Sequence, residues 1–205
     1  MRQSDQRGSV ISSRQNERLM DEAVEAHELE VDNNWDGLIR AVMGIMVLAV
    51  FALYVCTLGK QSLWFDGGLS VVFAGRPLPQ LMHTLIYQDI HPPLYYLLLH
   101  FWMPLAGTSE LAVRMPSAFA ALLLVPLTFA VVREVWGRDD GTTKHQAIVG
   151  TAAAALVGAS PFIAFYAQET RMYSLVAALA LATTWAFLKA TQTATRRWWL
   201  TFSVL

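Results

Sequence analysis

The stretch AVMGIMVLAVFALYVCTLG, residues Ala41–Gly59, decides the fold class of this chain. Its nineteen residues contain no charged side chain, and a helix needs about 20 apolar residues to cross a bilayer. The whole chain shares this character, because 55% of its 205 residues are hydrophobic and only 15% are charged. Soluble domains carry about 25% charged residues. The sequence therefore predicts a membrane protein.

Further apolar runs of similar length follow along the chain. They cover Met115–Val132, Ala147–Phe165 and Met172–Leu188, and another begins at Trp198. We therefore expect an all-α, polytopic transmembrane bundle over residues 37–205. In one of these runs Gly150, Ala154 and Gly158 are spaced four residues apart. Such spacing either lets another helix approach closely or is only alanine-rich filler.

Charge and cysteine content exclude several classes of protein. With 15 Lys and Arg against 16 Asp and Glu the net charge is −1, which indicates no nucleic-acid partner. The single cysteine, Cys56, excludes an intramolecular disulfide and a multi-cysteine zinc site. Residues 1–36 are polar and acidic, and we interpret them as a disordered cytoplasmic tail rather than a signal peptide.

The apolar segment Pro92–Ala106 has only fifteen residues and opens with two prolines. Cytoplasmic loops are enriched in Lys and Arg, so their distribution tests whether this segment spans. If it spans, seven of these residues lie inside and eight outside; if it rests on the outer surface, eleven lie inside and four outside. We therefore predict an interfacial or re-entrant helix within an extracytoplasmic loop over residues 60–114. The protein would then be a multi-pass protein of the plasma (inner) membrane with a cytoplasmic N-terminus.

Three candidate site residues lie in this predicted outer loop. Asp66 either acts as a general base at the membrane face or simply caps a short helix over Leu69–Ala74. His91 precedes the two prolines, which are typical of a helix start and would direct the imidazole into the loop. The alternative is an ordinary polar histidine with its hydrogen bonds satisfied. Arg76 is a further candidate for anion binding.

A second polar segment, residues 166–171, separates two predicted spans and contains Glu169 and Arg171. Charged residues so close to a membrane are functional candidates, and arginine binds phosphate through parallel hydrogen bonds. The alternative is an ordinary polar turn with a local ion pair worth less than about 1 kcal/mol. The predicted topology collects the candidates on one side of the membrane: Asp66, Arg76, His91, Glu169 and Arg171.

Five short motifs occur in series: LWFD at 63–66, HPPLYY at 91–96, AVRMPS at 112–117, SP at 160–161 and YAQETRMY at 166–173. In this order, over roughly residues 40–190, they resemble the GT-C glycosyltransferases. More narrowly, they are similar to the bacterial relatives of the dolichyl-phosphate-mannose protein mannosyltransferases and to the lipid A aminoarabinose transferases. The resemblance implies a polytopic membrane enzyme that takes a sugar from a polyprenyl-phosphate donor and passes it to a lipid, glycan or protein acceptor.

The resemblance also implies roles for the candidate residues. The acid of the first outer loop, here Asp66, would act as the base at the acceptor. Glu169 and Arg171 would lie near the donor or a bound cation, and the segment from His91 to Pro93 would line the lipid-phosphate site. The resemblance does not firmly imply any cofactor, and it leaves open a divalent cation near Glu169 and Arg171.

Two features depart from the family pattern. The first loop of the family usually reads Asp-Glu, whereas Gly67 follows Asp66 here, so any role of that second acid is vacant. The chain also ends inside an apolar run, whereas family members are much longer. We therefore expect it to be the N-terminal part of a longer enzyme.

The favoured hypothesis is sugar transfer at the outer membrane face, with Asp66 as base and Arg171 meeting the phosphate, helped by His91 or Arg76. A transporter or lipid-flipping subunit is the alternative. Such proteins tend to keep ionisable groups at mid-membrane, whereas the predicted spans contain no Asp, Glu, Lys or Arg. A non-catalytic scaffold is the third hypothesis, and it predicts that Asp66 and Glu169 are freely replaceable.

Overall fold

The computed structural model describes residues 35, 37–59, 62–88, 91–136 and 143–205. All secondary structure in these residues is helical, as the sequence predicts. The chain divides into two compact units, residues 1–42 and 43–205. Apart from Trp35, the predicted acidic tail 1–36 lies outside the described residues.

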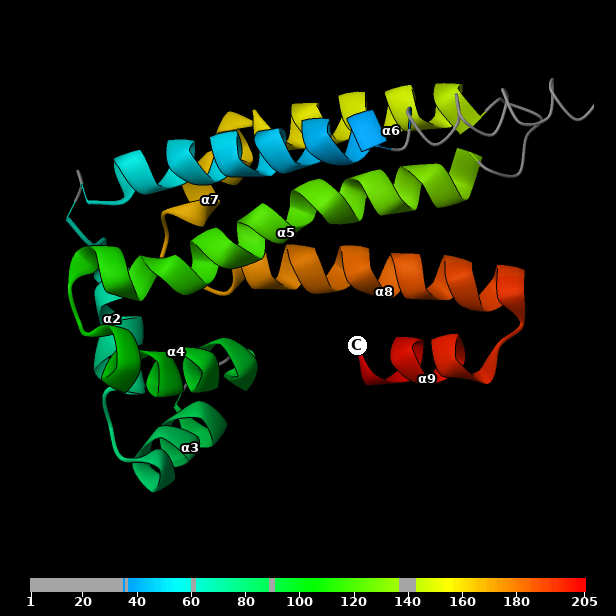
Figure 1. Cartoon of the computed structure of the whole chain (residues 1–205). Helices are drawn as coiled ribbons and strands as arrows, with labels where there is room; N and C mark the ends of the chain where they lie inside the picture. Colours follow the sequence, from blue (N-terminus) through cyan, green and yellow to red (C-terminus); the bar gives the residue numbers. More distant parts are fainter. Residues whose placement is uncertain (1–34, 36, 60–61, 89–90, 137–142) are drawn as a thin grey trace, which may run out of the picture. The chain divides into compact units, whose positions relative to one another are not determined.

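In the described part of the chain, three helices are long and apolar enough to cross a membrane: Gly37–Leu58, α5 (Glu110–Trp136) and α8 (Tyr173–Thr193). The bent pair α6 (Thr143–Gly158) and α7 (Pro161–Ala167) adds a fourth if it counts as one span. Figure 1 shows α6 and α8 beside α5, which contacts both. The predicted helical membrane bundle is therefore confirmed.

Helix α5 extends beyond the predicted run Met115–Val132 at both ends. It begins where the Ser109 hydroxyl accepts a hydrogen bond of 3.2 Å from the backbone N–H of Ala112, which satisfies one free donor of the first turn. The prediction followed uncharged residues only, whereas the helix continues through its charged ends. Charged side chains therefore lie close to both ends of this span.

The predicted single span Ala147–Phe165 is broken into α6 and α7, which are bent by 56°. Pro161 is the first residue of α7, and its ring nitrogen has no hydrogen to donate to the preceding turn. The last helical hydrogen bond of this turn is therefore the one from the N–H of Ala159 to the oxygen of Ala155, over 2.9 Å. The break turns the chain toward the loop that precedes α8.

The small residues of α6 let neighbouring helices approach closely. A Cβ atom added at Gly158 would lie 2.7 Å from Cγ2 of Val50, and one added at Gly150 would lie 3.0 Å from Cδ2 of Phe129. Ala154, between them, is fully buried. The close-packing interpretation of this stripe is therefore confirmed, and the interpretation as filler is wrong.

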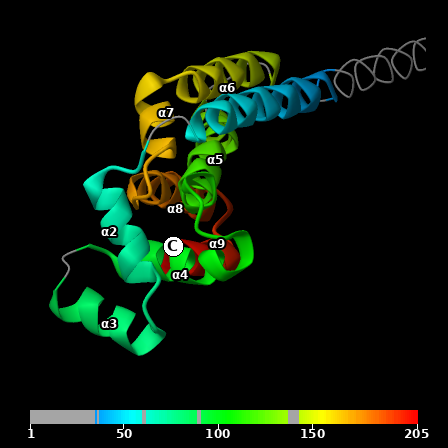
Figure 2. The same ribbon diagram turned by 90° about the vertical axis from the view of Figure 1, so that its left-hand side faces the viewer.

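Three shorter helices follow the first span: α2 (Phe65–Ala74), α3 (Leu78–Tyr87) and α4 (Pro93–Ala106). None of them is long enough to be among the candidate spans. Figures 1 and 2 show them together at the end of the bundle where α5 begins. Tyr95 and Leu99 of α4 form a buried cluster with Ala74 of α2 and Val113 of α5. That α4 lies on a membrane surface stays a prediction.

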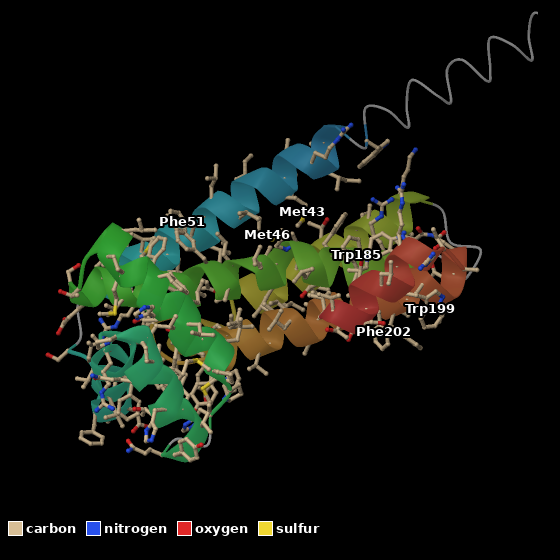
Figure 3. All side chains as sticks on the ribbon, turned by 90° about the horizontal axis from the view of Figure 1, so that it is seen from below. Met43, Met46, Phe51, Trp185, Trp199 and Phe202 are labelled. Carbon is tan, nitrogen blue, oxygen red and sulfur yellow. The ribbon has the colours of Figure 1, made fainter. Side chains whose placement is uncertain are left out.

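Helix α9 (Arg196–Val204) turns back along α8 (Figure 1). Aromatic side chains make this contact: the rings of Trp185 and Trp198 are 5.2 Å apart, and those of Phe187 and Phe202 are 5.5 Å apart. Figure 3 shows Trp185 and Phe202 near this junction. With nine residues, α9 is not among the candidate spans of the described residues, so a fifth crossing from Trp198 stays a prediction.

Candidate active site

The loop between α7 and α8 carries two of the predicted site residues, Glu169 and Arg171. Arg171 is only 7% exposed and its neighbour Thr170 is fully buried, while Glu169 is half-buried. Arginine is almost never this deeply buried without partners, because removing a charge from water is unfavourable. The surroundings of Arg171 therefore define the site.

One hydrogen bond joins this loop to α5, and a second joins α5 to α4 at the same serine. The Ser117 hydroxyl of α5 donates to the backbone oxygen of Arg171 over 3.1 Å, and the Tyr95 hydroxyl of α4 lies 2.8 Å from the same serine oxygen. Serine has a single hydroxyl proton, so Tyr95 must be the donor in the second bond. Burial raises the pKa of the Tyr95 phenol, which keeps the donated proton in place. The backbone position of Arg171 thus depends on two other helices.

His91 lies directly beside Arg171. Nη2 of the arginine is 3.0 Å from Nε2 of the imidazole. Because a guanidinium only donates, Nε2 must accept, and the ring proton is then on Nδ1. His91 precedes α4, whose N-cap is Pro92 and whose first residue is Pro93. The prediction that the two prolines begin a helix is confirmed, and His91 is in contact with the second polar segment.

Arg114 is a site residue that was not predicted from the sequence. It lies near the start of α5, is only 3% exposed, and its Nη1 donates a hydrogen bond to the backbone oxygen of Leu58 at the end of the first span. Its charge also acts on Glu169. A signal was present, because an arginine directly before the long apolar run from Met115 must be buried or reach the membrane surface.

The surroundings of Glu169 shift the pKa of its carboxyl in opposite directions. Burial raises the pKa of the Glu169 carboxyl, Arg114 and then Arg171 lower it, and Asp66 raises it. Charges influence one another this way only over short distances, so these four residues share one neighbourhood. Glu169 and Arg171 nevertheless form no direct ion pair within the described residues. The interpretation of this segment as a turn with a local ion pair is therefore wrong.

Asp66 is exposed and is the second residue of α2. The helix begins at Phe65 with Trp64 as its N-cap, so the alternative in which Asp66 caps a helix over residues 69–74 is wrong. Free backbone N–H groups in a first turn favour an acidic side chain there. A Cβ atom added at the neighbouring Gly67 would lie 3.6 Å from Cβ of Thr170, so α2 packs against the loop that carries Glu169.

Arg76 has other partners. Its Nη1 donates to the Thr84 hydroxyl of α3 over 2.7 Å, and its guanidinium lies 4.9 Å from the centre of the Phe73 ring. His91 and Arg171 are in direct contact, and the charges of Arg171 and Asp66 act on Glu169. The contacts of Arg76 instead join it to α3.

Five buried polar atoms have no hydrogen-bond partner in the described chain: Nε of Arg114, Nε of Arg171, Oγ1 of Thr170, Oγ of Ser174 and the hydroxyl of Tyr54. Each unpaired buried group costs about 1–3 kcal/mol, so such groups are rare. Three of them lie within residues 170–174. The two arginine N–H groups are charged donors suited to an anionic ligand. Among the described residues, no group of three or more His, Cys, Asp or Glu side chains is arranged to hold a metal ion.

The fold and these contacts define a multi-pass helical membrane protein with a charged site beside the ends of its helices. A family model described as dolichyl-phosphate-mannose-protein mannosyltransferase matches residues 90–205, more than half of the chain, and the chain therefore belongs to this family. The resemblance based on the five motifs is thus confirmed. The chain matches no curated protein and no solved structure.

Membership of this family implies a membrane glycosyltransferase that uses a dolichyl- or polyprenyl-phosphate sugar donor and an acceptor. The matched residues include His91, Arg114, Glu169 and Arg171. Asp66 and Arg76 precede them, so the assignment of a base in the first loop depends on the local chemistry of this chain.

Proposed function

We propose that the protein transfers a sugar from a polyprenyl-phosphate donor to a hydroxyl acceptor at the extracytoplasmic face of the plasma membrane, with Asp66 as the general base. The observation that carries this proposal is the pair of buried arginines, Arg114 and Arg171, each with an unpartnered Nε–H. Both act on the carboxyl of Glu169, which Asp66 also influences. A transferase needs cationic donors for a leaving phosphate and a carboxylate for an acceptor hydroxyl at one site.

In the proposed reaction the acceptor oxygen forms a bond to the anomeric carbon while the bond from that carbon to the phosphate oxygen breaks. Asp66 takes the proton of the acceptor hydroxyl, and the polyprenyl phosphate leaves with the bonding electron pair. Arg171 and Arg114 bind the negative charge that develops on the phosphate. Such contacts are strong because little water competes for the buried guanidinium groups. The base and the phosphate lie on opposite faces of the anomeric carbon.

The remaining residues take supporting roles in this proposal. His91 accepts a hydrogen bond from Arg171, which supports a role in orienting the guanidinium. Glu169 balances part of the positive charge of the two arginines while no donor is bound. Arg76 is the weaker candidate for phosphate binding, because Thr84 and Phe73 already hold its guanidinium.

The distribution of basic residues supports the proposed orientation, with eleven Lys and Arg inside and four outside. In Figure 1 the helices α2–α4 and the loop before α8 lie toward the same end of α5. One membrane face then contains all the proposed site residues, and the N-terminus is cytoplasmic.

The substitution Asp66→Asn tests the proposed base. Membranes that contain the protein are supplied with a radiolabelled polyprenyl-phosphate sugar, and labelled acceptor is measured. Because a positioned base contributes about 10²–10⁴-fold, Asp66→Asn should lower the transfer rate by that factor while the protein still inserts into membranes. Glu110→Gln is the matched control, since Glu110 is an exposed acid at the start of α5. A wild-type rate for Asp66→Asn would show that Asp66 is not the base.

A transporter or lipid-flipping subunit is the alternative function. The 56° break between α6 and α7 favours it, because transporters often contain broken helices. Against it, the charged residues of the candidate spans lie near the helix ends rather than at mid-span. Release of free polyprenyl phosphate distinguishes the two functions. A transferase releases it in proportion to glycosylated acceptor, whereas a transporter moves the donor intact.

A further inference from the structure

A polar cavity lies where α5 and α8 end and α6 begins. Its volume is about 460 Å³, within the size range of small-ligand sites. Phe129 and Trp185 form its apolar walls, and its basic residues are Arg133 and Lys189. Arg133 follows Arg114 by nineteen residues on α5, which is about 28 Å along a helix. The cavity is therefore separate from the site proposed for sugar transfer.

The charged groups of this cavity do not cancel. Nζ of Lys189 is 2.6 Å from Oε2 of Glu134, so these two form a direct ion pair. The guanidinium of Arg133 lies 5.6 Å from the centre of the Phe129 ring and has no carboxylate partner among the described residues. Among the described residues of the lining, two cations against one anion leave a net charge of +1. An anionic ligand would compensate it.

The level of the cavity relative to the membrane indicates which kind of anion could reach it. Arg133 lies three residues before the end of α5 at Trp136, and Lys189 lies four residues before the end of α8 at Thr193. The ends of membrane-spanning helices lie at the level of the lipid head groups. Trp185, which Figure 3 shows beside α9, lies eight residues before the end of α8, which is about 12 Å deeper along the helix.

We propose that this cavity binds the phosphate group of an anionic membrane lipid. Arg133 supplies parallel N–H donors to the phosphate oxygens. Phe129 and Trp185 contact the glycerol and the first acyl carbons. A membrane lipid fits this cavity better than a free phosphate ion, because the free ion has no apolar part that Phe129 and Trp185 could contact.

Native mass spectrometry of the purified full chain, stripped of lipid, tests this assignment. Phosphatidylglycerol and phosphatidylcholine with identical acyl chains are added in parallel, and inorganic phosphate is added as a third probe. The wild-type protein should retain phosphatidylglycerol in preference to phosphatidylcholine. Losing one charged donor pair in Arg133→Gln should lower this retention about tenfold. Arg197→Gln, which removes an exposed arginine of α9 outside the cavity, should leave it unchanged.

Arg133→Lys keeps the charge at this position and should restore part of the retention, and circular dichroism checks the helix content of each variant. Equal retention of the two lipids, or equal retention by Arg133→Gln and the wild type, would overturn the assignment. Displacement of phosphatidylglycerol by an equal concentration of inorganic phosphate would do the same, because it would indicate a site for a soluble anion.

Discussion

At the start of α5, Arg114 is 3% exposed, donates to a backbone oxygen and has an unpartnered Nε–H. Near the other end of the same helix, Glu134 forms an ion pair of 2.6 Å with Lys189, whose side chain is 30% exposed. Arg133 there lies over an aromatic ring and is half-buried. One helix thus carries buried, unpaired charge at its start and paired or water-accessible charge at its end.

The energetics of the two ends differ accordingly. The ion pair joins a 30% exposed lysine to an 11% exposed glutamate, so each charge has a partner and the pair needs no ligand to explain it. A buried arginine with an unsatisfied N–H costs about 1–3 kcal/mol, more for a charged group, unless something compensates it. Arg114 and Arg171 are both of this second kind, and they act on the same carboxyl, that of Glu169. A reaction in which phosphate is the leaving group requires preorganised hydrogen-bond donors of this kind.

The largest expected effect in this comparison comes from Arg171→Gln. Loss of charged hydrogen bonds to the phosphate removes about 1.5–3 kcal/mol, which corresponds to roughly a 10–150-fold decrease in kcat/KM for transfer from the labelled donor. Arg171→Lys should also be impaired, because an ammonium lacks the planar donor pair.

Arg197→Gln, at the opposite end of the bundle, is the control for loss of one positive charge. It should keep the wild-type kcat/KM, since Arg197 is exposed on α9. If both substitutions lowered kcat/KM equally, the difference between the two ends would have no functional meaning.

Much of this arrangement follows from local sequence signals. Uncharged runs predict the spans, because spanning a bilayer is a property of about 20 consecutive residues. The two prolines after His91 predict a helix start for the same local reason. Family resemblance then directs attention to Glu169 and Arg171, which do lie in one neighbourhood with Asp66.

The remainder depends on which side chains meet in three dimensions. Arg114 is buried because it reaches the carbonyl oxygen of Leu58, fifty-six residues earlier, and no local pattern encodes that contact. The contacts of Arg76 with α3 are likewise a matter of how α2 and α3 pack. Tyr95 and Ser117 belong to motifs that the sequence singles out, but only the fold shows that they hold the backbone of Arg171.

A smaller effect is expected from Tyr95→Phe. The substitution removes the proton donated to Ser117 and leaves the ring in its packed position, so the loop that carries Arg171 loses one buried constraint. A hydrogen bond of this kind contributes about 1 kcal/mol, so kcat/KM should fall about fivefold. Ser117→Ala should act in the same direction, because it removes the bond to the loop itself.

Tyr87→Phe is the matched control, since Tyr87 of α3 is 74% exposed. The same chemical change there should leave kcat/KM unaltered. If Tyr95→Phe also left it unaltered, Tyr95 would serve packing alone and the backbone of Arg171 would be held by other contacts.

The smallest expected effect is the pH dependence that Glu169 adds to stability. Its pKa is raised above the ordinary value of 4.5, chiefly by burial, so the folded state holds this proton more tightly than the unfolded chain does. Its contribution to the free energy of unfolding is therefore largest below pH 4.5 and falls as the pH rises from there through the raised pKa.

Glu169→Gln cannot ionise, so its free energy of unfolding should lack this decrease with pH. Glu110→Gln, at an exposed position, should keep the decrease. Thermal unfolding of the three proteins on both sides of pH 4.5 measures the difference. Should the stability of the wild type instead rise with pH relative to Glu169→Gln, the two arginines would outweigh burial. The charges near the start of α5 would then behave as paired ions, like Glu134 and Lys189 near its other end.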